Sequence, residues 1–307
     1  MRKNTIILMI VIGGLIFYTA CGEDDDGGGQ GAPTPTPAAS PPPEGGVPMT
    51  CPGCNLSQNP EIGVDNCFSL DLSDVNWSGC DLENAFLLGA KMERANLSGA
   101  NLKKANLNSA DLMDAKFNKA ILADTRIGGA NLIGADFSDT DLTTANLDLS
   151  EMSKAKFIRS NLSGQDLGSL DPESMRIFDE ADFTDANMTN VNFENSRATL
   201  AKFIRTNLTN ANLSSARLTS ADFTSAKLVT TDLGMAILGL ARLVDADLSG
   251  ANLAGANLFE ANLLGANLSG ANLSGVNLSL ATWVNGQTCD AGSNGCCRVS
   301  GQCLPNP

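Results

Sequence analysis

The chain has 307 residues, a net charge of −14 and no histidine. Without histidine it lacks the commonest general acid–base group and the commonest metal ligand, which weighs against hydrolases and zinc enzymes. We therefore expect no catalytic, cofactor-binding or metal-binding residue. The acidic balance also disfavours nucleic acid as a partner, because phosphate backbones are bound by Lys and Arg patches.

Residues 1–20 are predicted to be a secretory signal peptide. Two basic residues precede an apolar run over residues 5–18, and the small Ala20 then precedes Cys21. A run this short favours a signal over a bilayer-spanning helix. The segment resembles a bacterial lipoprotein signal, which implies that Cys21 is lipidated and becomes the new N-terminus. Tyr18 departs from the aliphatic residue usual in that family, and an uncleaved anchor is the alternative.

Residues 21–50 are predicted to be a lipidated cysteine followed by an acidic, Gly- and Pro-rich tether. Large apolar residues are almost absent from it, so it cannot bury enough surface to fold. Its Gly part is flexible and its Pro part semi-rigid. By the resemblance to lipoproteins, Gly22 is not the aspartate that signals inner-membrane retention, which favours the outer membrane. We therefore expect an exported protein whose membrane partner is reached through the lipid.

Residues 72–167 and 183–283 carry a five-residue period. Every fifth residue is apolar, Ala198 being the weak position, and the residue two before it is usually Ala. A period of five matches neither the 3.6-residue turn of an α-helix nor the two-residue alternation of a strand. The pattern closes only if the chain turns once per repeat, with Ala and Leu inside and the polar triplet outside. Stacked turns would then form parallel ladders.

The spacing of phenylalanines indicates how many sides each coil has. They recur 20 residues apart in both segments, which suggests four repeats per coil and one stacked column: Phe117, Phe137 and Phe157, then Phe183, Phe203 and Phe223. Repeats such as residues 95–99, Ala-Asn-Leu-Ser-Gly, resemble the pentapeptide-repeat family. The resemblance implies an all-β, right-handed quadrilateral parallel β-helix of about ten coils, and it carries over no catalytic residue.

Residues 168–182 are predicted to shift the register. Leu167 and Phe183 are 16 residues apart, so either one residue bulges or six loop out near Pro172. If six loop out, one outward column carries charges of alternating sign: Lys116, Asp136, Lys156, Asp182, Lys202, Asp222 and Arg242. Stacked strands lie ~4.8 Å apart, close enough for each charge to meet opposite charges above and below. Local duplication of the repeat is the alternative explanation of the column.

Cysteines cluster in two predicted caps, residues 51–71 and residues 284–307. Apart from Cys21 the chain has eight, all near the ends of the repeat region: Cys51, Cys54, Cys67, Cys80, Cys289, Cys296, Cys297 and Cys303. Even numbers of clustered cysteines in an exported protein indicate disulfides. Disulfide-bonded caps would protect the open edges of the terminal coils, which otherwise template aggregation.

At the amino-terminal end, Cys54 and Cys80 are 26 residues apart, which equals one coil plus six residues. A loop there would stack the two within disulfide range, and Cys51 would then pair with Cys67. A metal half-site or a redox pair formed by Cys51 and Cys54 is the alternative.

At the carboxyl-terminal end, the tail from Trp283 to Cys297 resembles a cap found in some pentapeptide-repeat proteins. It has the order W-x-x-G-x-x-C, then Gly-Ser-x-Gly and another Cys. By that resemblance Cys289 pairs with Cys297, which leaves Cys296 for Cys303.

The function predicted from these elements is that of a non-enzymatic exported lipoprotein. It would present a rigid β-solenoid as a binding or structural module, with an unidentified protein or envelope component as partner. The alternative is a DNA mimic that binds topoisomerase, as some family members do; acidity supports it, whereas export and the mixed charge do not. Residues 246–281 contain only two charged side chains, Asp247 and Glu260, so this stretch is either an idealised coil or an association face.

Overall fold

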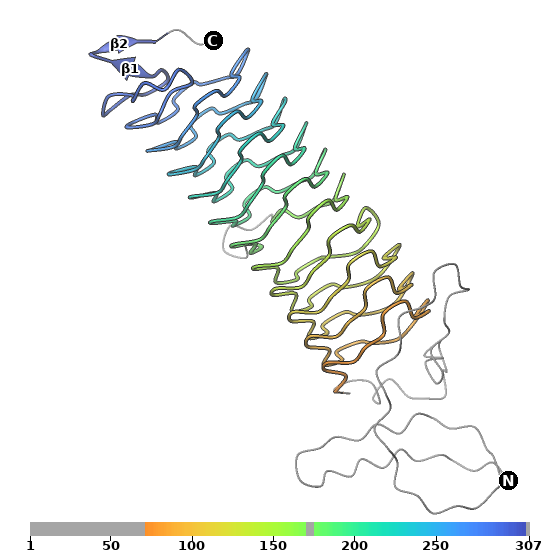
Figure 1. The fold of residues 1–307 in the computed structure, drawn as a ribbon. Coiled ribbons are helices and arrows are strands. Elements are labelled where there is room, and N and C mark those ends of the chain that lie inside the picture. The colour runs from red at the N-terminus through yellow and green to blue at the C-terminus, as the bar shows by residue number, and fades with distance from the viewer. Residues whose placement is uncertain (1–70, 170–174, 305–307) are drawn as a thin grey trace, which may run out of the picture.

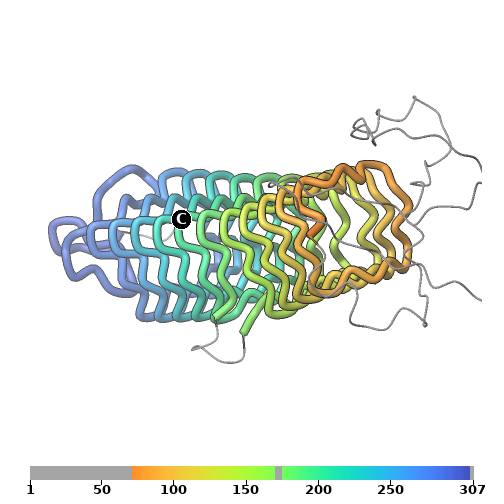
Figure 2. Tube along the Cα trace, turned by 90° about the horizontal axis from the view of Figure 1, so that it is seen from below, coloured from red at the N-terminus to blue at the C-terminus, as the bar shows by residue number. Residues whose placement is uncertain are grey.

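The protein is a rod of stacked coils. The computed structural model describes residues 71–169 and 175–304, and Figure 1 shows their coils stacked in chain order along one axis. Neighbouring coils are joined by parallel bridges between residues 20 apart, such as Asp81 with Asn101. Seen from below in Figure 2, the successive coils wind around one common interior. Four five-residue repeats therefore make one coil, as the phenylalanine spacing predicts.

Each repeat is held by the same few hydrogen bonds. The Leu82 N–H donates to the Asn101 carbonyl of the next coil at 2.7 Å, and the Asn101 N–H donates back to the Cys80 carbonyl at 2.9 Å. The Ala85 N–H then donates to the Leu82 carbonyl at 3.0 Å and closes the corner. Asn84, the third residue of this corner, has a φ of 60°, in the left-handed region. A positive φ at this position is the mark of a type II turn, which Gly and Asn favour.

The interior is filled by the periodic Leu, Phe and Ala side chains. Leu97 and Ala100, for example, are both 0% exposed. Phenylalanine rings stack along one side of the interior with centroids 4.7 to 5.5 Å apart, in the order Phe117, Phe137, Phe157, Phe183, Phe203 and Phe223. The core is therefore one continuous apolar column with a stack of aromatic rings along it.

The interruption leaves the register of the coils intact. Lys156 and Asp182 form a parallel bridge although they are 26 residues apart, and the 20-residue spacing returns at Ile177 with Arg197. Six additional residues are therefore accommodated within one coil, and the one-residue bulge is excluded. The repeat resumes one unit before the predicted start of the second segment. Phe178 is 0% exposed and takes the apolar position five residues before Phe183, although the residue two before it is Arg176 and not the usual Ala.

The last coil continues into a short cap. Antiparallel bridges join Asn277 to Asn294 and Thr282 to Thr288. The cap ends in an antiparallel hairpin of β1 (Arg298–Val299) and β2 (Gln302–Cys303), visible at the carboxyl-terminal end in Figure 1. In the described part of the chain these are the only strands longer than one residue, because each side of a coil contributes one bridged residue per repeat.

The predicted signal peptide, tether and amino-terminal cap lie outside the described residues, apart from Asp71, the first residue of the coil. Within residues 71–169 and 175–304, no helix has the length and hydropathy needed to cross a bilayer.

Candidate functional site

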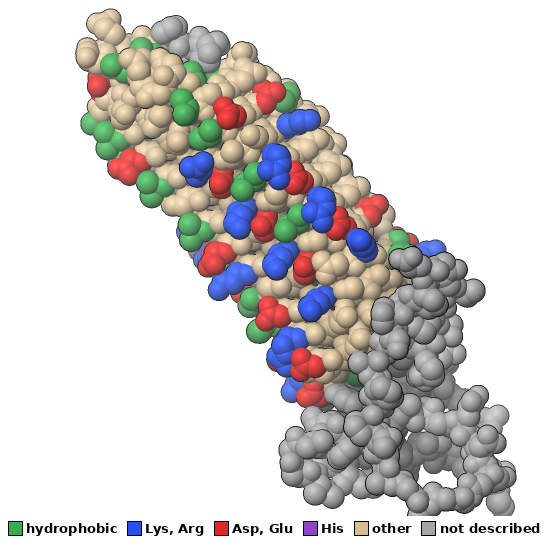
Figure 3. All heavy atoms as spheres, viewed as in Figure 1, with side chains coloured by type: hydrophobic (Ala, Val, Ile, Leu, Met, Phe, Trp, Pro, Cys, Tyr) green, Lys and Arg blue, Asp and Glu red, His purple; other side chains and the backbone are tan. Residues whose placement is uncertain are grey.

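One side of the rod carries a column of charges whose sign alternates from coil to coil. Each member is bridged to the next in parallel, across the interruption as elsewhere: Lys116, Asp136, Lys156, Asp182, Lys202, Asp222 and Arg242. Figure 3 shows basic and acidic side chains interspersed along the rod. The structure thus places all seven residues of the predicted column in one line.

Direct ion pairs form at two steps of this column. Lys202 Nζ lies 3.5 Å from Asp182 Oδ2, and Arg242 Nε lies 3.5 Å from Asp222 Oδ2. Asp182 and Asp222 thus each pair with the cation of the following coil, whereas the sequence predicted contacts on both sides. More than half of the Lys202 side chain is exposed, so such a pair contributes only ~0.2–1 kcal/mol. The alternation of sign therefore contributes little free energy of folding through ion pairs, and its main effect is that like charges do not stack on adjacent coils.

Asp136 is held as an anion by local hydrogen bonds. Partial burial on its own would raise the pKa of this carboxyl, but hydrogen bonds from Ser138 and Asn118 and the charge of Lys156 outweigh it and lower the pKa. The Ser138 hydroxyl donates to Asp136 Oδ1 at 2.6 Å, and the Ser138 N–H donates to the same oxygen at 2.9 Å. The same pattern, a side-chain oxygen accepting the N–H two residues on, recurs along the rod and shapes its corners.

A second alternating column runs beside the first, three residues further along each coil. The Arg159 guanidinium donates two parallel hydrogen bonds, of 2.6 and 2.7 Å, to the Asp139 carboxylate. The Arg205 guanidinium donates two of 2.7 Å to Asp185. Such bidentate pairs are the strongest form of charge-assisted hydrogen bond. The sequence analysis missed this column, although the signal was present as a second sign alternation at 20-residue spacing.

The bidentate pairs shift the pKa of their members in opposite directions. The hydrogen bonds from Arg159 and Arg205 lower the pKa of Asp139 and of Asp185, and the guanidinium pKa values rise in return. All four groups are therefore charged at neutral pH. Where the two columns run side by side, neighbouring members of one coil carry like charge, and the sign changes from each coil to the next.

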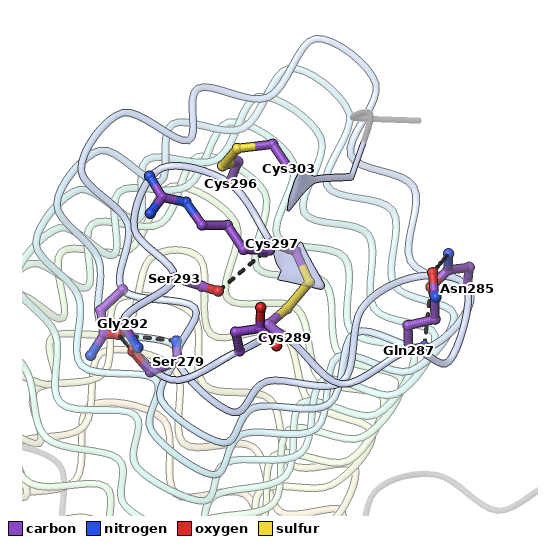
Figure 4. Close-up of a disulfide and its surroundings, with 12 residues drawn as sticks. Ser279, Asn285, Gln287, Cys289, Gly292, Ser293, Cys296, Cys297 and Cys303 are labelled. Atoms are coloured by element: carbon purple, nitrogen blue, oxygen red, sulfur yellow. Dashed lines mark hydrogen bonds between the residues drawn. A yellow bond between two sulfur atoms is a disulfide. The ribbon is translucent and has the colours of Figure 1, made fainter. Parts of the chain in front are cut away.

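The carboxyl-terminal cap is closed by two disulfides, shown in Figure 4. Cys289 is bonded to Cys297 with Cα atoms 5.0 Å apart, and both side chains are buried. Cys296 is bonded to Cys303 in β2 with Cα atoms 5.7 Å apart. These are the pairings that the resemblance to the family's cap implies. The second disulfide ties the hairpin to the segment that covers the last coil.

Hydrogen bonds dock this cap on the last coil. The Gly292 N–H donates to the Ser279 hydroxyl of the last coil at 3.0 Å, and within the cap the Arg298 N–H donates to the Ser293 hydroxyl at 3.1 Å (Figure 4). Ser293 is itself only 1% exposed, so the cap has its own buried polar anchor.

The remaining predicted site residues lie largely outside the described part of the chain. The structure does not describe Cys21, the predicted lipidation site, or the disulfide candidates Cys51, Cys54 and Cys67. Cys80 is described, is 5% exposed and is disulfide-bonded. Within the described ranges, no group of three or more Cys, Asp or Glu side chains is arranged to hold a metal ion.

The repeat region matches a known family profile. The profile of pentapeptide repeats matches in eight copies, and more than half of the chain falls within the matched residues 66–99, 90–127, 125–164, 177–214, 199–234 and 241–279. A search of curated proteins gave no significant match.

Several solved structures are similar. HetL, a pentapeptide repeat protein involved in heterocyst differentiation regulation in the cyanobacterium Nostoc sp. strain PCC 7120, has 26% identity and a TM-score of 0.36, covering 71% of this chain and 91% of its own. Full-length QnrB1, a plasmid-mediated fluoroquinolone resistance protein, has 16% identity and a TM-score of 0.29, covering 69% and 92%. A thylakoid-lumen pentapeptide repeat protein of Arabidopsis thaliana has 26% identity and a TM-score of 0.21, covering 44% and 66%.

Proposed function

Because the chain belongs to the pentapeptide-repeat family, whose members fold as right-handed quadrilateral β-helices and are generally structural or binding proteins, we propose a non-enzymatic role at a cell envelope. In this proposal the protein is an exported lipoprotein that presents a rigid solenoid to a partner. The observation that carries it is the state of the cysteines: those within the described residues, Cys80, Cys289, Cys296, Cys297 and Cys303, are all disulfide-bonded. Disulfides persist in oxidising compartments outside the cytoplasm, which supports export.

The solenoid suits a presenting role because it is stiff and long. Its apolar column is continuous across the interruption, where Phe157 and Phe183 stack with centroids 5.0 Å apart. About ten coils at ~4.8 Å each give a rod of roughly 50 Å. A partner would therefore meet a flat, pre-formed surface and would not have to order it.

The amino-terminal segment supplies the proposed attachment. Lipidation of Cys21 would place the first residue of the mature protein in the membrane surface, and residues 22–50 would then separate it from the folded part. A flexible chain of this length has a root-mean-square span of about 30 Å. The rod could therefore lie beside the membrane or stand away from it, within reach of envelope components.

The DNA-mimic alternative has one observation in its favour, the acidic net charge of −14. A mimic of the phosphate backbone needs acidic groups in succession, whereas the first column changes sign at every coil from Lys116 to Arg242 and the second does so as far as Arg205. Inhibition of DNA gyrase by a chain lacking residues 1–21 would favour the alternative, and absence of inhibition would favour the envelope proposal.

Metabolic labelling of bacteria with radioactive palmitate tests the attachment. The wild-type protein should carry label and sediment with the membranes, and Cys21→Ser should abolish both the label and the cleavage before residue 21. Cys303→Ser is the matched control, because it removes a cap cysteine and should leave the labelling unchanged. A wild-type chain without label, or a Cys21→Ser variant that is still labelled, would refute the proposal.

A further inference from the structure

One coil exposes apolar side chains across a whole side of the rod. Met235, Ile237 and Leu240 are 66%, 39% and 52% exposed, and Phe259 on the following coil is 39% exposed. The backbone between them follows the regular repeat, with Leu238 buried at 0% exposure, so the outward positions are apolar in addition to the inward ones. We call Met235, Ile237, Leu240 and Phe259 the apolar band.

Two members of the apolar band occupy positions that disfavour large side chains. Met235 has a φ of 59° and Leu240 a φ of 62°, where glycine is free of strain. The equivalent corner one coil above Met235 is Gly255, and a Cβ there would collide with the Met235 sulfur. What distinguishes this coil is that exposed apolar side chains stand at both of its corners, Met235 and Leu240, and at Ile237 between them.

Charged residues flank the apolar band on its two sides along the rod axis. Arg217 is bridged to Ile237 from the coil below, and Glu260 follows Phe259 on the coil above. In the described part of the chain neither forms a salt bridge, whereas Arg197, one coil further down, pairs with Asp179. A cation below and an anion above the band therefore remain available to a partner.

We propose that the apolar band is a two-fold interface with a second copy of this chain, in which the two rods run antiparallel. A two-fold axis across the coil of Ile237 exchanges the coil below with the coil above. Arg217 of one copy then faces the coil that carries Glu260 of the other, and each band covers its counterpart. Such an interface is self-complementary, as two-fold symmetry requires.

The composition and the charge order support a second copy over other occupants. Met, Phe and Arg are enriched at the centres of protein interfaces, where Lys and Glu are depleted. A parallel arrangement of the rods would place Arg217 opposite Arg217, which repels. An anionic membrane surface is disfavoured because the chain carries a net charge of −14.

Sedimentation velocity of the full chain in non-ionic detergent, over a series of protein concentrations, tests the interface. We expect a monomer–dimer equilibrium whose dissociation constant rises on the order of tenfold or more in Met235→Gly/Leu240→Gly. Glycine suits the backbone at both sites, so the thermal midpoint should not fall. Leu149→Gly is the matched control: Leu149 is 79% exposed with a φ of 58°, on the same corner column as Met235, and its loss should leave the dimer unchanged.

A charge swap tests the antiparallel pairing. Arg217→Glu and Glu260→Arg should each weaken the dimer, and the double variant should restore most of the wild-type affinity. Association through the membrane anchor would persist in every variant and would overturn the proposal. A wild-type chain that is monomeric at all concentrations would also overturn it. If that monomer binds phosphatidylglycerol-containing vesicles and Met235→Gly/Leu240→Gly does not, the band contacts a membrane and not a second copy.

Discussion

Phe157 and Phe183 offer the sharpest stability experiment, because they touch only if six residues loop out between them. Both rings are 0% exposed, and their planes lie 6° apart with centroids 5.0 Å apart. A stacked pair contributes about 0.5–1.5 kcal/mol beyond the area it buries. Replacing either ring with Leu removes this contribution, so the double variant should lose less stability than the sum of the single variants. We expect a coupling free energy of about 1 kcal/mol.

The assay is urea unfolding followed by circular dichroism on the wild type, the two single variants and Phe157→Leu/Phe183→Leu. Phe157 with Phe223 is the control pair, since these rings belong to the same column and are not in contact. Sites this far apart should add within about 0.3–0.5 kcal/mol. A coupling between Phe157 and Phe183 as small as that of the control pair would refute the continuous register of the rod.

Three further predictions concern strain, charge and the cap. Leu149→Gly should raise the free energy of unfolding by about 1 kcal/mol, because relief of roughly 1–3 kcal/mol of strain at φ 58° exceeds the chain entropy that glycine adds, and a fall in stability would contradict this. The pKa of Asp139 is lowered by its hydrogen bonds from Arg159, so its stabilising contribution is complete above the ordinary aspartate pKa and is lost as the pH falls through the lowered folded-state value. Thermal melts of the wild type and Asp139→Asn should therefore differ at pH 7 and converge once the pH falls below the lowered pKa of Asp139; a difference that grows on acidification would show the opposite sign. Cys289→Ser/Cys297→Ser should lower the free energy of unfolding by about 2–3 kcal/mol in non-reducing urea titrations, and an unchanged midpoint would show that the cap does not depend on this disulfide.

Most of the fold follows from the amino-acid sequence because one short period determines nearly every contact. A residue such as Leu97 must point inward once the chain turns every five residues, and the 20-residue recurrence of phenylalanine then sets the number of sides. The same arithmetic predicted that Lys156 lies beside Asp182. Phe178 was missed although it lies five residues before Phe183, because Arg176 stands where the repeat usually has Ala.

The functional surfaces were harder to predict because they depend on the outward positions, where the repeat imposes no residue type. The column of Asp182 was found, but its ion pair with Lys202 depends on side-chain conformations that spacing does not encode. The apolar band escaped notice because a Leu at a corner, such as Leu240, looks like any other Leu until its positive φ and its exposure are known. The second charged column, with Arg159 on Asp139, could have been found by repeating the search three residues further along.

The central claim, an exported rod attached through its amino terminus, is tested most directly by one mass measurement. The protein would be purified from bacterial membranes, and the mass of its amino-terminal peptide determined. We predict a peptide that begins at Cys21 and carries a diacylglyceryl group on the sulfur. A peptide that begins at Met1, or a free thiol at Cys21, would contradict the account.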